Sequence, residues 1–127
     1  MTHLAIQPAS LGKMSVADEH VVSVTTVDGI THTVTLPRGY VFDGASIPRL
    51  AWSMIGHPFD PSFLVAAAVH DWYCDQAAQT HDYQLRVIGD AVFFALLRRA
   101  GVSWLKRSAM YLAVRSYGLW SFRKVRK

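Results

Sequence analysis

The sequence has a single cysteine, Cys74, among its 127 residues. No disulfide can form within the chain, and a cysteine-rich zinc site is excluded because it needs several thiolates. The apolar stretches are shorter than the ~20 residues of a membrane-spanning helix. The first twenty residues also lack the basic start and apolar run of a signal peptide. The sequence therefore predicts a protein that has no transmembrane segment, is made in the cytoplasm and is stabilised by packing.

Acidic residues are missing from the last part of the chain. All nine lie before residue 91, whereas the last thirty residues hold nine Lys and Arg. Such a segment can attract the phosphate groups of nucleic acid, anionic lipid or a cell-envelope polymer. A basic tail can equally serve solubility alone. Both interpretations stay open, and no nucleic-acid recognition module supports the first of these partners.

The residue pattern predicts an α+β fold in a single domain, with a small N-terminal antiparallel sheet followed by three main helices. The β-branched runs 21–27 and 30–36 are separated only by Asp28 and Gly29. Because an Asp-Gly pair suits the positive φ angles of a type I′ turn, these runs predict a β-hairpin with a two-residue loop. Residues 40–42 could add a short third strand.

The helices follow from apolar periodicity and from start and stop signals. A shaped loop is expected at 43–49, since the residue before Pro48 avoids helical dihedrals, and Pro48 can open a short helix. Longer helices are expected from about residue 62 to 74, from 82 to 100 with Gly101 as its stop, and from 103 to 117. The predicted organisation is an N-terminal segment at 1–20, one domain at 21–118 and a basic tail at 119–127.

An ionisable cluster is expected between the first two long helices. His70 continues the apolar stripe of Phe63, Ala66 and Ala67 and is followed directly by Asp71. Arg86 and Asp90 are four residues apart on the next helix, which should pack antiparallel to the first. Buried groups of this kind need partners, a metal or a cleft. The cluster can therefore be a structural network or a functional site.

Four segments resemble, in order and spacing, the DUF1353 family of small phage and prophage proteins. They are TLPRGYVFDGASIPRLAW, AAAVHDWYC, RVIGDAVFFALLRRAGV and AMYLAVRSYG. The resemblance covers about residues 33–118. The matched positions are Asp43, Ser46, Pro48, Arg49, His70, Asp71, Arg86, Asp90, Tyr111 and Arg115. One departure is Cys74, with Tyr73 before it, where many members have a tyrosine.

Several chemistries fit these positions. The His-Asp pair is similar to that of secreted phospholipases A2, which would make His70 a general base, Asp71 with the Asp43–Gly44 loop a calcium site, and Asp90 the residue that orients the imidazole. A zinc site would use His70 with Asp71 or Asp90 and Asp43. Ser46 with His70 and Asp90 would form a triad. The remaining candidate binding residues are Gly44, Arg49, Tyr73, Arg86 and Arg115.

Two functions are expected from these observations. The first is a phage-encoded hydrolase, acting on host peptidoglycan or lipid through His70, Asp71 and Asp90, with or without a divalent metal. The second is a non-enzymatic phage accessory or virion protein, in which the cluster is structural and the basic, aromatic C-terminal region binds a phage or host protein. Synthesis is expected in the host cytoplasm, and lysis or virion assembly would take the protein to the envelope.

Overall fold

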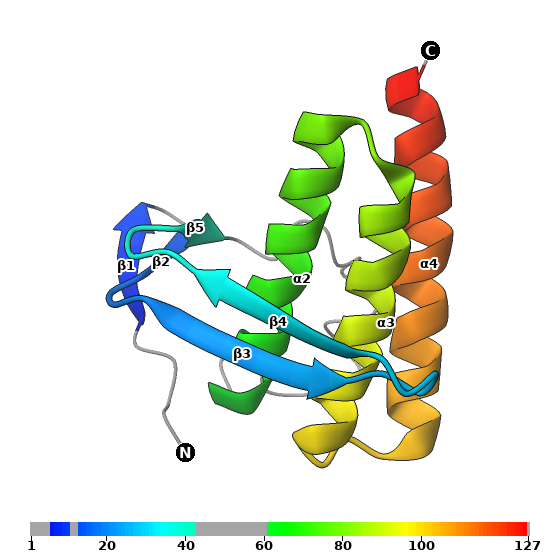
Figure 1. The fold of residues 1–127 in the computed structure, drawn as a ribbon, viewed down its shortest axis with the longest axis horizontal. Coiled ribbons are helices and arrows are strands. Elements are labelled where there is room, and N and C mark those ends of the chain that lie inside the picture. Colours follow the sequence, from blue (N-terminus) through cyan, green and yellow to red (C-terminus); the bar gives the residue numbers. More distant parts are fainter. Residues whose placement is uncertain (1–5, 11–12, 43–60, 127) are drawn as a thin grey trace.

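The computed structural model describes residues 6–10, 13–42 and 61–126. Its elements are β1 (Ile6–Ser10), β2 (Lys13–Val16), β3 (His20–Thr25), β4 (Thr31–Leu36), β5 (Val41–Phe42), α2 (Pro61–Thr80), α3 (Tyr83–Arg99) and α4 (Trp104–Arg126). β1, β2 and β5 lie to the left of the helices, the β3–β4 hairpin runs across α2 and α3, and α4 is the outer helix on the right (Figure 1). The predicted α+β order of a small sheet region followed by three long helices is confirmed.

The predicted hairpin is formed by β3 and β4, which pair from His20 opposite Leu36 to Thr25 opposite Thr31. Its loop differs from the expected two-residue turn. Gly29 N donates to Thr26 O at 2.9 Å and Thr26 N to Ile30 O at 3.0 Å, and only Gly29 has a positive φ. Asp28 instead accepts hydrogen bonds from the Thr26 hydroxyl and from Ile30 N. These bonds favour a three-residue loop closed by a left-handed glycine.

The alternation of apolar and polar residues along the hairpin decides which of its faces packs on the helices. Val22 and Val24 on β3 and Val34 and Leu36 on β4 are buried. On the opposite face, the hydroxyls of Ser23 and Thr33 lie 2.6 Å apart and those of Thr25 and Thr31 2.8 Å apart. Because successive strand residues point to opposite faces, the Val/Leu face turns towards α2 and α3.

A second sheet contains strands that sequence patterning missed. β1 and β2 pair with each other, and β2 also pairs with β5, through Met14 opposite Phe42. β1 contains Pro8 next to an irregular register. Proline and the lack of apolar alternation hide such a strand from local prediction. The expected third strand at 40–42 is observed as β5, but in a sheet separate from the hairpin.

Two helices are longer than predicted. α2 continues to Thr80 instead of ending near residue 74, and α4 runs to Arg126 instead of ending near Tyr117. The predicted stop at Gly118 is wrong, because this glycine provides room inside the fold: an added Cβ would lie 2.9 Å from Arg86 Nε. The bounds of α3 agree with prediction, with Asp82 as N-cap and Gly101 at φ 87° just after its end.

The helices pack closely because small residues line their contact. Ala66, Ala67 and Ala68 on α2 are fully buried. Gly89 on α3 lies against α2, where an added Cβ would stand 2.4 Å from Tyr73 Cβ. Large side chains, such as Phe93 and Leu97 on α3 and Met110 on α4, fill the rest of the core. This close packing brings polar groups of all three helices into one place.

Candidate functional site

The centre of the candidate site is a hydrogen bond between two fully buried side chains on neighbouring helices. His70 Nε2 on α2 lies 2.6 Å from Asp90 Oδ1 on α3, and both residues have 0% exposure. His70 is buried because it continues the apolar stripe of α2, as predicted. Its ring also packs on Phe93, with 4.9 Å between ring centroids. An ionised Asp90 at this depth needs cationic partners.

Two arginines supply those partners. Arg115 Nη1 on α4 donates to Asp90 Oδ2 at 2.7 Å, and its Nη2 donates to the Tyr83 hydroxyl at 2.7 Å. Arg86 Nε, one turn before Asp90 on α3, lies 3.7 Å from Asp90 Oδ1. One carboxylate thus links α2, α3 and α4. We call His70, Arg86, Asp90 and Arg115 the Asp90 cluster.

The protonation of His70 depends on its neighbours. Burial alone would lower the pKa of His70, but the adjacent Cys74 sulfur and the hydrogen bond to Asp90 outweigh it and raise the pKa to about 9. The Cys74 Sγ lies 3.9 Å from both ring nitrogens. At neutral pH the imidazole is therefore mainly protonated and acts as a third cation next to Asp90.

Arg86 is held largely by shape. Its guanidinium lies 5.9 Å from the ring centroid of Tyr117 and against Gly118. It is buried, and neither Nε nor Nη2 has a hydrogen-bond partner. Its contribution to the cluster is therefore the charge near Asp90 and the packing of its guanidinium against Tyr117 and Gly118 of α4.

The structure brings together only part of the predicted site. His70, Arg86, Asp90 and Arg115 meet, whereas Tyr83 joins through Arg115 without having been predicted. Asp71 is also buried and is not without an interaction partner. Tyr73 packs on Gly89, and burial raises its pKa. Tyr111 packs edge-on against Phe94, with centroids 5.7 Å apart. Asp43, Gly44, Ser46, Pro48 and Arg49, with the expected loop and short helix, lie outside the described residues.

The sequence offered one signal that Tyr83 belongs to the candidate site: its place in the first turn of α3, one turn before Arg86. Helical spacing puts such residues on one side of the helix. Its bond to Arg115 joins residues 32 positions apart, and no local pattern encodes that pairing.

Two of the four predicted metal ligands, His70 and Asp90, are hydrogen-bonded to each other in the Asp90 cluster. Asp90 Oδ1 is turned to His70 Nε2 and Oδ2 to Arg115. Two guanidinium groups would repel a divalent cation at that carboxylate. Within residues 6–10, 13–42 and 61–126, no three His, Cys, Asp or Glu side chains form a metal-ligating group. Asp90 and His70 Nε2 thus already have protein partners, Asp43 lies outside the described residues, and a metal site stays a prediction.

Comparisons with known proteins agree on the family. A family model described as "Protein of unknown function (DUF1353)" matches residues 18–114. Two proteins of Sinorhizobium fredii (strain NBRC 101917 / NGR234) are similar, "Uncharacterized protein y4jT" with 40% identity over 84 residues and "Uncharacterized protein y4iH" with 34% over 76. The alignments cover 65% and 60% of this chain, but only 23% and 30% of those relatives.

This chain thus matches less than a third of the length of either relative. No solved structure matches it. No helix in the described part of the chain is long and apolar enough to cross a membrane. The family match includes β3, β4, β5, α2, α3 and α4 up to Val114, and with them His70, Arg86 and Asp90. The chain therefore belongs to the DUF1353 family.

Proposed function

We propose that this domain is a non-enzymatic binding module that docks on an anionic membrane surface through the outward face of α4. The observation that carries this proposal is the row of large apolar side chains on that face. Trp104, Leu105, Leu112, Leu119 and Trp120 are between 48% and 73% exposed. We call these five residues the α4 face.

Helix geometry makes the α4 face continuous. Leu105, Leu112 and Leu119 are seven residues apart, which is almost two full turns, so they lie along one line. Met110, Val114 and Gly118 are buried on the opposite side of the same helix. Figure 1 shows α4 packed on α3, with its other side turned away from the rest of the fold. A row of exposed leucines and tryptophans on one helix is typical of an interaction surface.

Charge favours an anionic lipid surface over a second copy of this chain. No acidic residue follows Asp90, whereas nine Lys and Arg do. Two α4 faces packed together would bring like charges into proximity, while an anionic leaflet attracts basic residues by about 1 kcal/mol each. Tryptophan and leucine beside Lys and Arg are also the composition of helices that lie in the membrane interface.

The Asp90 cluster has a structural role in this proposal. The carboxylate of Asp90 is surrounded by cationic side chains and has no exposed surface. It joins α4 to α3 and α2, which holds the α4 face in a rigid position. We further propose that the chain is phage-encoded and acts at the host envelope after synthesis in the host cytoplasm.

Sedimentation with lipid vesicles tests the docking proposal. The protein should bind vesicles of phosphatidylglycerol and not of phosphatidylcholine. The substitution Leu112→Asp should weaken binding to phosphatidylglycerol vesicles about tenfold or more, because burying a leucine side chain contributes about 1.5–3 kcal/mol. Val21→Asp is the matched control, since Val21 is 56% exposed on β3, outside the α4 face.

Three results would reject the proposal: no binding to phosphatidylglycerol, equal loss in Leu112→Asp and Val21→Asp, or no loss in either. An anionic envelope polymer, which has no apolar phase, would bind through charge alone. Binding to such a polymer would therefore be insensitive to Leu112→Asp.

A hydrolase acting on peptidoglycan or lipid is the second candidate, and the His70–Asp90 hydrogen bond favours it. An acid that orients a histidine is a common feature of general-base sites. As a base His70 would have to be neutral, which its pKa of about 9 disfavours at neutral pH, and water would have to reach its buried ring. With Nε2 bonded to Asp90, the neutral ring would take a proton from water through Nδ1. The hydroxide would then attack an ester or amide carbonyl, and the alcohol or amine would leave with that proton. Asp71 and Ser46 remain candidate partners of such a base, and Asp43 with Asp71 remains the candidate cation site.

Product analysis tests the hydrolase. Purified peptidoglycan and phosphatidylglycerol vesicles should release soluble fragments or fatty acid with the native chain and not with His70→Gln, while both proteins keep a folded circular dichroism spectrum. Release that a chelator abolishes, with stoichiometric metal in the native chain, would establish metal dependence. Absence of product from the native chain on both substrates would reject this candidate.

A further inference from the structure

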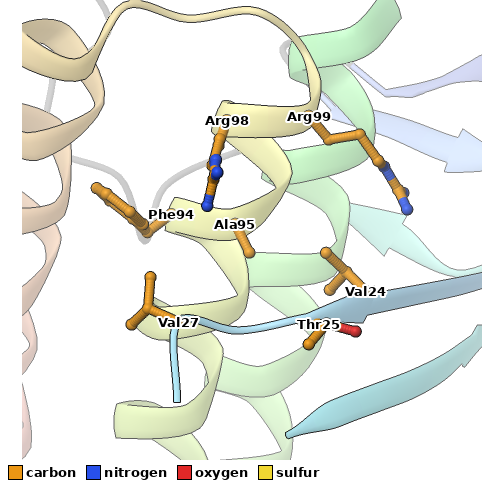
Figure 2. A pocket seen from close by; sticks show the side chains of 7 residues that line it. All are labelled: Val24, Thr25, Val27, Phe94, Ala95, Arg98 and Arg99. Atoms are coloured by element: carbon orange, nitrogen blue, oxygen red, sulfur yellow. The ribbon is translucent and has the colours of Figure 1, made fainter. Parts of the chain in front are cut away.

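A hollow near the C-terminal end of α3, beyond the Asp90 cluster along the helix, combines an apolar floor with positive charge. It has a volume of about 310 Å³ and lies between the hairpin and the last two turns of α3. Figure 2 shows its lining, which consists of Val24, Thr25 and Val27 from the hairpin and Phe94, Ala95, Arg98 and Arg99 from α3. This volume is at the lower end of the range of small-molecule sites.

The two arginines that line this hollow differ in whether their guanidinium groups are already hydrogen-bonded. Arg99 Nη1 donates to Ser23 O at 2.8 Å, which ties the end of α3 to β3. Arg98 is exposed, and within the described ranges no hydrogen bond or ion pair engages its side chain. In Figure 2 its side chain extends alongside Phe94 and Ala95. Arg98 therefore offers an unpaired guanidinium next to apolar surface.

A third guanidinium adds to the positive potential. Arg107 on α4 lies over the Phe94 ring, 5.4 Å from its centroid, and its buried Nε has no hydrogen-bond partner. Asp28, the acid of the adjacent hairpin loop, already accepts from Thr26 and Ile30. Arg107 and Arg98 thus both lie near Phe94, and the acid closest in sequence to this part of the hairpin is engaged within its own loop.

We propose that this hollow binds a small amphiphilic carboxylate, whose oxygens pair with Arg98 and whose apolar chain lies on Val24, Val27 and Phe94. Charge complementarity selects an anion, since planar guanidinium groups match carboxylates. The apolar floor selects an anion with a hydrocarbon part over inorganic phosphate or sulfate. None of its lining residues belongs to the α4 face, so the proposal does not depend on membrane docking.

Titration of the ¹⁵N-labelled full chain with octanoate, followed by two-dimensional NMR, tests this site. Octanoate should shift the amide signals of residues 24–27 and 94–99 and reach saturation. Acetate lacks the apolar chain and octanol lacks the charge, so each should bind more weakly. Arg98→Gln should weaken octanoate binding about three- to fivefold, as expected for a solvent-exposed ion pair.

Arg38→Gln is the matched control, because Arg38 is an exposed arginine in the turn before β5, at the other end of the hairpin. It should bind octanoate as the native chain does. Unsaturable shifts, shifts confined to α4, octanol binding equal to that of octanoate, or equal behaviour of the Arg98 and Arg38 variants would each overturn the proposal. Val27→Ser provides a second test, because it removes apolar surface from a loop residue that is 78% exposed. This variant should bind octanoate more weakly than the native chain does.

Discussion

Asp90 connects more of the fold than any other single side chain of the candidate site. Its two oxygens meet His70 of α2 and Arg115 of α4, and Arg86 of its own helix lies near. A buried ion network of this kind is costly to disrupt, because removing one member leaves uncompensated charge. The identity of His70 and Asp90 as buried partners was predictable from helical spacing. That Arg115 belongs to the candidate site was suggested only by the family resemblance.

The raised pKa of His70 predicts a pH-dependent stability. The His70 pKa is about 9 in the folded chain and about 6.5 in the unfolded chain. The stabilisation is therefore complete below about pH 6.5 and is lost as pH rises through about 9. The free energy of unfolding from urea titrations should fall by up to about 3 kcal/mol over this range.

His70→Gln separates this effect from the titration of other groups. Its free energy of unfolding should be lower than that of the native chain at about pH 6, and the two should converge at about pH 10. A constant difference between the two proteins across this range would show that His70 is not protonated preferentially in the folded state.

At the scale of elements, the contact between α2 and α3 depends on the absence of a side chain at Gly89. Local patterning predicted both helices and the bounds of α3, because apolar periodicity and capping residues act within a few positions. It did not predict why a glycine stands inside a helix, where it costs stability. The reason lies on the neighbouring helix, at Tyr73.

Gly89→Ala should destabilise the protein. The new Cβ would lie 2.4 Å from Tyr73 Cβ, an atom fixed to the backbone, so the helices must separate. Overpacking costs about 1–3 kcal/mol, and the better helix propensity of alanine offsets only part of it. Urea unfolding should show a net loss of about 1 kcal/mol or more.

Gly118→Ala is the matched control for this variant. There the new Cβ meets the guanidinium end of Arg86, which can rotate, so the loss of stability should be smaller. A larger loss at Gly118 than at Gly89 would place the critical close approach between α3 and α4 instead.

At the scale of the whole molecule, the charge is divided along the chain. The net charge is +4, yet every acid precedes residue 91. The early acids are partly paired within the fold, as in the 2.7 Å hydrogen bond from the Tyr40 hydroxyl to Asp75. α4 therefore carries unbalanced positive charge together with its exposed apolar face.

This combination predicts how vesicle binding responds to salt. Affinity for phosphatidylglycerol vesicles should fall several-fold between about 50 mM and about 300 mM NaCl, because surface charges are screened over shorter distances at higher salt. Residual binding at high salt should remain sensitive to Leu112→Asp, since the apolar contribution is not screened. Vesicle sedimentation at the two salt concentrations measures both effects. Salt-independent binding would contradict the electrostatic part of the docking proposal.

The sequence by itself determined the local elements of this protein. The alternation of apolar and polar residues encodes β3 and β4. The 3.6-residue apolar periodicity encodes the helices and places His70 on their inner side. Both periods follow from backbone geometry within one segment. Tertiary structure decided the rest: the partnership of Asp90 with Arg115, the continuation of α4 past Gly118, and the side of α4 that stays uncovered. These features depend on which segments become neighbours after folding, and that choice is made by packing among residues far apart in the chain.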